Sequence, residues 1–199
     1  FNAVPLQLGR KLKYTNVSAL YQSRELGQAL ELLEKAGLVN RIYHSSANGI
    51  PLEAEKNTRR FKAIFFDTGL ALRLLRIPVK DMILNNDITL INEGAIAEQL
   101  AGQEIQSYTP IREKPKLYYW HREAKSSNAE VDYVIEQDNA IIPIEVKSGL
   151  GGTLRSLHMF IEEKKSEFGI CLTQKKYSEY NHIQFMPLHS IGRIFNSGA

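Results

Sequence analysis

Two apolar stretches of the chain carry ionisable residues that could do chemistry. Residues 131–135 include Asp132, and residues 140–147 end in Glu145 and Lys147. Charged side chains are costly among aliphatic strand residues unless something compensates them. Because side chains alternate along a strand, Glu145 and Lys147 are expected on one face. If the two stretches pair as a hairpin, two carboxylates and one ammonium converge. Such oxygens suit a hard divalent cation, and the lysine could hold a water or a phosphoryl oxygen.

The elements that must position these residues follow one another as α-β-β-β-α-β from about residue 81. Helical and alternating patterns, with the polar turn at 137–139, predict this order and an α/β (α+β) fold with a central mixed sheet. Glu93 and Glu98 lie on the first predicted helix. The predicted elements are a helix over 92–105, strands over 116–121, 130–136 and 140–147, a helix over 154–165, and strands over 168–173 and 183–187.

The first 80 residues predict a different order of elements. Short helices over 17–21 and 23–36 precede strands over 38–43 and 60–66, with Asn48-Gly49 as a turn between the strands. Helix, helix, strand, turn and strand is the order of a winged helix. Asp67 is expected to cap a further helix rather than to act in catalysis.

Composition and charge bound the class of protein. The chain has 199 residues, of which 43% are hydrophobic and 24% charged, as in ordinary globular proteins. No apolar run reaches the roughly 18 residues of a membrane span, and no signal peptide is visible. The single cysteine, Cys171, is expected as a buried thiol in a reducing cytoplasm. Because the chain begins at Phe1, we expect it to be a piece of a longer protein.

The charge is distributed unevenly along the chain. Residues 1–80 carry 13 Lys and Arg against 6 Asp and Glu, whereas residues 81–199 carry 12 against 16. This asymmetry suggests two modules, 1–80 and 81–199, of which the first could face a polyanion. A solvated basic face without a partner is the alternative.

Three segments carry a resemblance to a known family. They are FFDTGL at 65–70, AEVDY at 129–133 and IEVKSG at 144–149. With the predicted order of elements, they resemble the PD-(D/E)XK nuclease superfamily, which has the restriction-endonuclease-like fold. More narrowly, they resemble the uncharacterised C-terminal domain of prokaryotic AAA-type ATPases, a domain preceded by a winged helix.

The resemblance implies roles for particular residues. Asp132 and Glu145 would ligate Mg²⁺, Lys147 would orient the attacking water or stabilise charge on the phosphate, and Glu98 would complete the outer shell of the cation. The glycine-rich loop at 148–153 could offer N–H groups to a phosphate. Alternatively, Lys147 forms a structural ion pair with Asp132 or Glu145, because a fold does not fix a function.

The first module supplies a candidate nucleic-acid interface for DNA or RNA. Polar residues on a groove-entering helix, with basic residues on a wing, are typical of DNA binding. Several glutamates on the same helix oppose this interpretation, and winged helices also join proteins. No Gly-x₄-Gly-Lys-Ser/Thr loop is present, so an ATP site would belong to an upstream ATPase. The alternative function is non-catalytic docking or homo-oligomerisation of that ATPase. The predicted contacts are Arg24, Gln28, Lys56, Arg59, Arg60 and Lys62.

Overall fold

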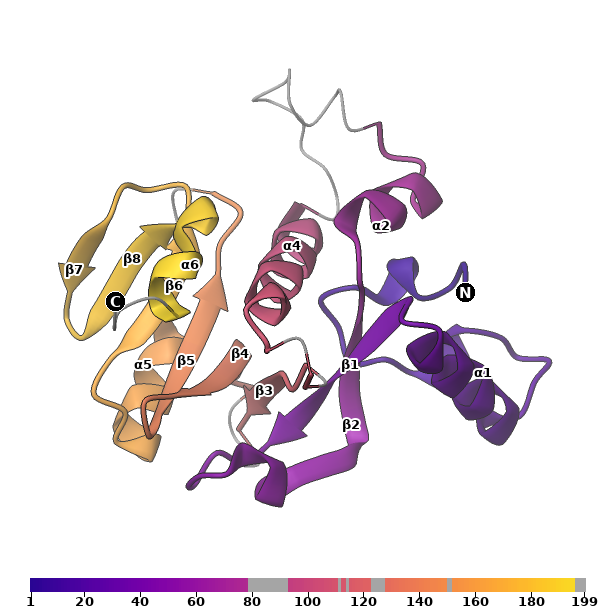
Figure 1. Ribbon diagram of the computed structural model, residues 1–199, viewed down its shortest axis with the longest axis horizontal. Helices are drawn as coiled ribbons and strands as arrows, with labels where there is room; N and C mark the ends of the chain where they lie inside the picture. Colours follow the sequence, from indigo (N-terminus) through magenta and orange to yellow (C-terminus); the bar gives the residue numbers. More distant parts are fainter. Residues whose placement is uncertain (79–92, 111, 114, 123–127, 150–151, 196–199) are drawn as a thin grey trace.

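The computed structural model describes residues 1–78, 93–110, 112–113, 115–122, 128–149 and 152–195 (Figure 1). Within these ranges the chain forms five α-helices and eight strands. The α-helices are α1 (Ser23–Lys35), α2 (Thr68–Leu74), α4 (Glu93–Ser107), α5 (Arg155–Lys164) and α6 (Gly192–Phe195). The strands are β1 (Val39–Ser45), β2 (Lys56–Phe65), β3 (Tyr118–His121), β4 (Glu130–Gln137), β5 (Ala140–Val146), β6 (Gly169–Thr173), β7 (Ser178–Tyr180) and β8 (Ile183–Pro187).

All eight of these strands form one mixed sheet in the order β2-β1-β3-β4-β5-β6-β8-β7. The first half of the chain contributes the hairpin β1–β2, and β1 pairs in parallel with β3 of the second half. The hairpin β4–β5 lies at the centre, and β5, β6 and β8 run parallel to one another. The two predicted modules, 1–80 and 81–199, therefore contribute strands to the same sheet.

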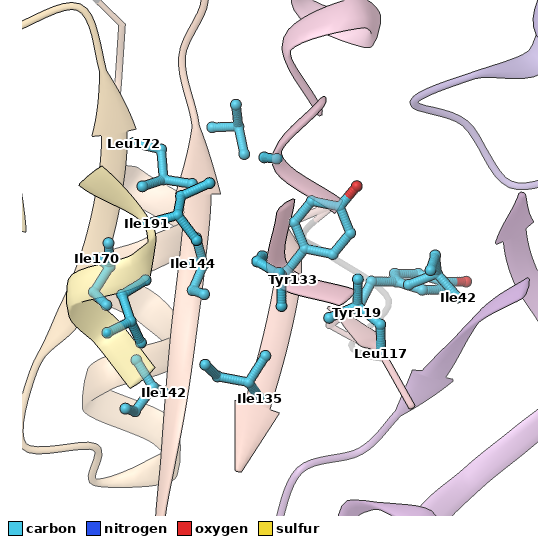
Figure 2. Close-up of a cluster of buried hydrophobic side chains, with 14 of the residues drawn as sticks. Ile42, Leu117, Tyr119, Tyr133, Ile135, Ile142, Ile144, Ile170, Leu172 and Ile191 are labelled. Carbon is cyan, nitrogen blue, oxygen red and sulfur yellow. The ribbon is translucent and has the colours of Figure 1, made fainter. Parts of the chain in front are cut away.

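Helices cover both faces of the second half of the sheet. On one face, residues of α4 and α6 pack against alternate residues of the central strands, among them Ile142, Ile144 and Ile170 (Figure 2). On the opposite face, Leu157 and Phe160 of α5 pack against the strand residues that point to that side of the sheet. None of the described helices is long and apolar enough to cross a membrane.

The hairpin β1–β2 has its own apolar cluster, which joins α1, α2 and the N-terminal segment. Val4 and Leu8 are buried there with Phe61 and Phe65 of β2. The expected helix over 17–21 is wrong, because only a single 3-10 turn forms nearby, at Tyr14–Asn16. The winged-helix arrangement is therefore not confirmed, although α1 and both strands form where they were predicted.

The helix cap at Asp67 and the turn between β4 and β5 are confirmed. The Asp67 Oδ1 atom accepts a hydrogen bond from the Leu70 N–H at 2.7 Å, at the start of α2. Asp138 and Asn139 both adopt positive φ, as a two-residue hairpin turn requires. Elements follow in the predicted order from α4 to β6. The sequence analysis missed β7 and α6, which are only three and four residues long.

A β-bulge interrupts β4 at Asp132. Tyr118 of β3 pairs with Val134 and Trp120 pairs with Val131, so β4 has one residue more than its partner between these pairs. Val131 and Val134 consequently lie in the same apolar cluster, whereas strict alternation predicts opposite faces. A bulge redirects side chains locally, and here it affects the strand position that carries Asp132.

Helix α4 lies unusually close to the sheet. A Cβ atom on Gly102 would be 2.5 Å from the Tyr133 hydroxyl and 2.8 Å from a methyl of Ile64, so a side chain there cannot be accommodated. The Tyr133 hydroxyl donates a hydrogen bond to the Glu98 carbonyl at 2.7 Å, and Figure 2 shows it turned toward α4. This approach fixes the helical turn that carries Glu98 against the strands.

Candidate active site

A buried lysine holds three carboxylates at one end of the central strands. The Lys62 Nζ atom on β2 lies 2.8 Å from Glu98 Oε1, 2.9 Å from Glu130 Oε1 and 3.7 Å from Asp132 Oδ1. Lys62 is 1% exposed and Glu98 is 8% exposed. We call Lys62, Glu98 and Glu130 the Lys62 group. It joins β2, α4 and β4, and therefore both halves of the sequence.

The ammonium of Lys62 is strongly favoured in this position. Burial disfavours the charged form, but the charges of Glu98, Asp132 and Glu130 outweigh it and raise the Lys62 pKa well above its ordinary value. Burial raises the pKa of the Glu98 carboxyl to about 7, and the Lys62 ammonium only partly opposes this effect. The Lys62 group is therefore a network in which one protein cation contacts every acid.

Asp132 connects this network to the end of β5. Its Oδ1 faces Lys62, and its Oδ2 accepts a hydrogen bond from the Val146 N–H at 2.9 Å. At this end of the β4–β5 hairpin the last paired residues are Tyr133 and Ile144. One further residue in the same antiparallel register places Asp132 beside Glu145. The sequence-predicted convergence of the two strands is thus present in the structure.

Glu145 and Lys147 form the second part of the site, which we call the Glu145 group. The Lys147 Nζ donates to Glu145 Oε1 at 2.7 Å. The Glu145 Oε2 atom is buried and has no hydrogen-bond partner among the described residues. Burial, together with the charge of Asp132, raises the Glu145 pKa to about 7. One oxygen of this carboxylate is therefore uncompensated.

The thiol of Cys171 lies next to the Glu145 group, because Cys171 pairs with Glu145 across β5 and β6. It is a buried free thiol, as the sequence predicts. Burial and the nearby Glu145 charge raise its pKa to about 11. It therefore stays protonated at neutral pH and is a poor nucleophile.

The donor set at Asp132 and Glu145 fits a hard divalent cation. Mg²⁺ keeps several waters and needs only one or two carboxylates from the protein. The unpaired Glu145 Oε2, next to a second carboxylate, is the kind of atom that such an ion would satisfy. No set of three or more His, Cys, Asp and Glu side chains is arranged as a metal site in the described ranges. Any cation here would therefore depend on this pair.

The structure brings together all four residues that the sequence singled out for chemistry: Asp132, Glu145, Lys147 and Glu98. One oxygen of Glu98, Oε1, accepts a hydrogen bond from Lys62 Nζ at 2.8 Å, so this carboxylate already has a cation of the protein beside it. Its role in the outer shell of a metal ion at Asp132 and Glu145 stays a prediction.

The interpretation of Lys62 as a nucleic-acid contact on a wing needs correction. Its side chain is buried and paired with carboxylates, so it cannot reach a phosphate backbone. Lys62 and Glu130 are the site residues that sequence reasoning missed in their actual role. A signal existed for Lys62: it lies between Phe61 and Ala63 in the apolar end of its strand, residues 61–65, as Asp132 lies among apolar residues in its own strand.

The other predicted nucleic-acid contacts lie on the surface or in a local ion pair. Arg24 and Gln28 are exposed on α1. Arg59 and Arg60 are exposed where β2 bulges away from β1, between the pairs His44–Asn57 and Tyr43–Phe61. Lys56 pairs with Glu53 and lies 4.8 Å from the centre of the Tyr43 ring. The predicted phosphate-binding loop at 148–153 includes residues 150–151, which lie outside the described residues.

Comparison with known proteins gives two family matches. The model described as "Domain of unknown function (DUF4143)" matches residues 93–191. The model described as "Domain of unknown function (DUF8612)" matches residues 1–81. Searches of curated proteins and of solved structures gave no match. The chain is therefore similar, in its two halves, to two families whose descriptions name no activity.

Proposed function

We propose that this chain binds nucleic acid and cleaves phosphodiester bonds with Mg²⁺ at Asp132 and Glu145, as the C-terminal part of an AAA-type ATPase. The observation that carries the proposal is the uncompensated Glu145 Oε2, buried beside Asp132 and next to Lys147. A buried carboxylate oxygen without a hydrogen-bond partner lowers stability, and such costs concentrate at functional sites. The fold would be of the restriction-endonuclease-like type, preceded by a winged-helix-like unit.

The residues of the chain would divide the work as follows. Asp132 and Glu145 would hold the ion, which when bound would polarise a phosphoryl oxygen. Lys147, whose side chain is partly exposed, would stabilise negative charge on the phosphate or position the attacking water. Lys62 would remain a structural cation beside Asp132. The Asp132 carboxylate is already oriented by the Val146 N–H.

A panel of single- and double-stranded DNA and RNA, with Mg²⁺ or Mn²⁺, tests the proposal. We expect wild-type protein to cleave one of these forms, and Lys147→Ala and Glu145→Gln to lower the rate at least about 100-fold. Lys176→Ala, which removes an exposed lysine far along the sequence, is the matched control and should cleave like wild type. Equal rates in wild type and Lys147→Ala would show that any cleavage comes from elsewhere.

A second function is favoured by the Lys62 group. Because Lys62 compensates three of the four carboxylates, the cluster also fits a structural network in a non-catalytic module that docks or oligomerises the ATPase. Absence of cleavage on every form of nucleic acid, together with no binding at low salt, would favour this alternative. Salt-dependent binding without cleavage would leave nucleic-acid binding as the function.

A further inference from the structure

The N-terminal segment forms a basic pocket beside the Lys62 group. A cavity of about 380 Å³ lies between residues 6–16 and Glu130 of β4. Three cationic residues line it against one carboxylate. The lining residues that matter here are Gln7, Gly9, Arg10, Lys11, Lys13 and Glu130.

One buried side chain of this pocket has an unused donor. Gln7 is 6% exposed, and its Oε1 accepts a hydrogen bond from the Lys13 N–H at 2.9 Å. Because a backbone N–H can donate only to the oxygen, this bond fixes the orientation of the amide, and Nε2 must face the other way. In the described part of the chain, Gln7 Nε2 has no acceptor. A buried amide donor without an acceptor costs about 1–3 kcal/mol, so the position calls for a ligand oxygen.

The charge of the pocket also calls for an anion. Arg10 and Lys13 are exposed, and neither forms an ion pair with another residue that the structure describes. The one carboxylate, Glu130, is already shared: Lys62 contacts its Oε1 at 2.9 Å and Lys11 approaches its Oε2 at 3.6 Å. Glu130 therefore repels an incoming anion little, and the uncompensated charge is positive.

The pocket is held rigidly next to the candidate active site. The backbone of Lys11 forms an isolated antiparallel β-bridge with Lys62 of β2. Next to it, the Leu12 N–H donates a hydrogen bond to the Phe61 carbonyl at 2.9 Å. Gly9 adopts φ +69°, and a Cβ atom there would lie 3.1 Å from Glu98 Oε2 and 3.2 Å from the Ala95 Cβ. The segment thus packs directly on α4 beside Glu98. Gln7 Nε2 itself has almost no accessible surface, so a ligand oxygen would reach it through a small movement of the side chains that cover it.

We infer that this pocket binds a backbone phosphate of the nucleic acid, with Gln7 Nε2 donating to a phosphate oxygen and Arg10 and Lys13 compensating its charge. The inference rests on the nucleic-acid binding proposed above and assigns it a place that the sequence did not suggest. Through the shared residue Glu130, the bound phosphate would lie next to the Lys62 group. The strand would then continue toward Asp132 and Glu145.

Binding of a labelled oligonucleotide over a range of salt concentrations, without divalent ions, tests the inference. We expect Arg10→Ala/Lys13→Ala to raise Kd about tenfold at low salt, and to lower the slope of log K against log salt by about 1. The charge-matched control Arg73→Ala/Lys176→Ala removes two exposed cations elsewhere and should retain the wild-type slope. Both variants alter exposed side chains, so folding is not at stake.

A second variant separates the Gln7 donor from bulk charge. Gln7→Glu keeps an oxygen for the Lys13 N–H but replaces the Nε2 donor with a charged acceptor. We expect it to weaken binding several-fold more than Ser178→Glu, which adds the same charge at the far edge strand β7. Equal effects of these two variants, or a wild-type Kd and salt slope in Arg10→Ala/Lys13→Ala, would overturn the inference. A thermal shift with inorganic phosphate that is lost in that double variant, while oligonucleotide affinity is unchanged, would overturn it too.

The two proposals fail in different ways. Should the protein bind oligonucleotides through this pocket but never cleave them, the catalytic proposal fails and the pocket stands. Should Arg10→Ala/Lys13→Ala cleave with the kcat and KM of wild type, the pocket fails and the catalytic proposal stands.

Discussion

The Lys62 group and the Glu145 group both pair a lysine with a buried glutamate, yet the carboxylate oxygens are satisfied differently in the two groups. In the first, one fully buried ammonium contacts Glu98, Glu130 and Asp132. In the second, a partly exposed ammonium contacts one oxygen of Glu145 and leaves the other without a partner. The first arrangement satisfies itself, whereas the second is incomplete within the described chain.

This difference indicates where stability and function lie. A compensated buried network holds elements together, here β2, α4 and β4, and breaking it should be costly. An uncompensated buried carboxylate lowers stability unless it is protonated or meets a cation. We therefore expect loss of the Lys62 ammonium to lower stability, and loss of the Glu145 charge to raise stability at pH 8 while abolishing cleavage.

The largest effect is expected from Lys62→Met, which keeps the length of the side chain and removes its charge. Three carboxylates then lose their common partner, and we expect a loss of about 3–5 kcal/mol in the free energy of unfolding at pH 8. Urea unfolding measures it. The matched variant Lys11→Met removes a half-buried lysine 3.6 Å from Glu130 and should cost less than about 1 kcal/mol. A cost for Lys62→Met as small as that for Lys11→Met would contradict the assignment of the network.

An intermediate effect of opposite sign is expected from Glu145→Gln. Because the folded-state pKa of Glu145 is about 7 against an ordinary 4.5, the native state binds its proton more tightly than the unfolded state. The wild type therefore loses stability as pH rises from about 4.5 to about 7, by about 3 kcal/mol at 1.36 kcal/mol per pKa unit. The Glu145→Gln variant has no carboxyl group at this position, so its stability does not fall over this pH range for that reason.

Urea unfolding of Glu145→Gln and wild type at pH 5 and pH 8 tests this linkage. We expect the variant to be more stable than wild type at pH 8 and close to it at pH 5. The control Glu104→Gln, on the more exposed side of α4, should show no such pH-dependent gain. If Glu145→Gln is less stable than wild type by the same amount at pH 5 and pH 8, the Glu145 carboxylate has a partner in solution. The contrast between the Lys62 group and the Glu145 group would then be wrong.

The smallest effect is expected from Lys147→Ala. It removes the one partner of Glu145 Oε1, so the Glu145 pKa should rise further and stability at pH 8 should fall by about 1 kcal/mol. At pH 5, where Glu145 is already protonated, the loss should vanish. A loss of equal size at both pH values would indicate that Lys147 acts through packing rather than through charge.

The positions of the strands that carry the site were predicted well from the sequence. The directions and partners of their side chains were predicted less well. Apolar residues at 142, 144 and 146 correctly placed Glu145 and Lys147 on the other face of β5. Alternation failed at Asp132, because the bulge on β4 comes from its pairing with β3 and is not encoded locally. The role of Lys62 depends on partners 36 and 68 positions away, and no local pattern reports contacts at that range.

The N-terminal region was predicted less well, for a physical reason. No helix or strand was predicted over residues 1–13, yet Val4 and Leu8 are core residues and Gly9 packs on α4. Their burial requires the hairpin β1–β2 and α4 to be in place first. Short segments without a period gain their structure from such tertiary contacts, which also create the basic pocket.

Titration of the protein with Mn²⁺, followed by the signal of the free ion, tests the central claim most directly. The account predicts one saturable site per chain at pH 8 in wild type, lost in Glu145→Gln and retained in the control Glu104→Gln. It also predicts weaker binding at pH 5, where protonation of Glu145 competes with the ion. The absence of saturable binding in wild type, or equal binding in wild type and Glu145→Gln, would contradict it.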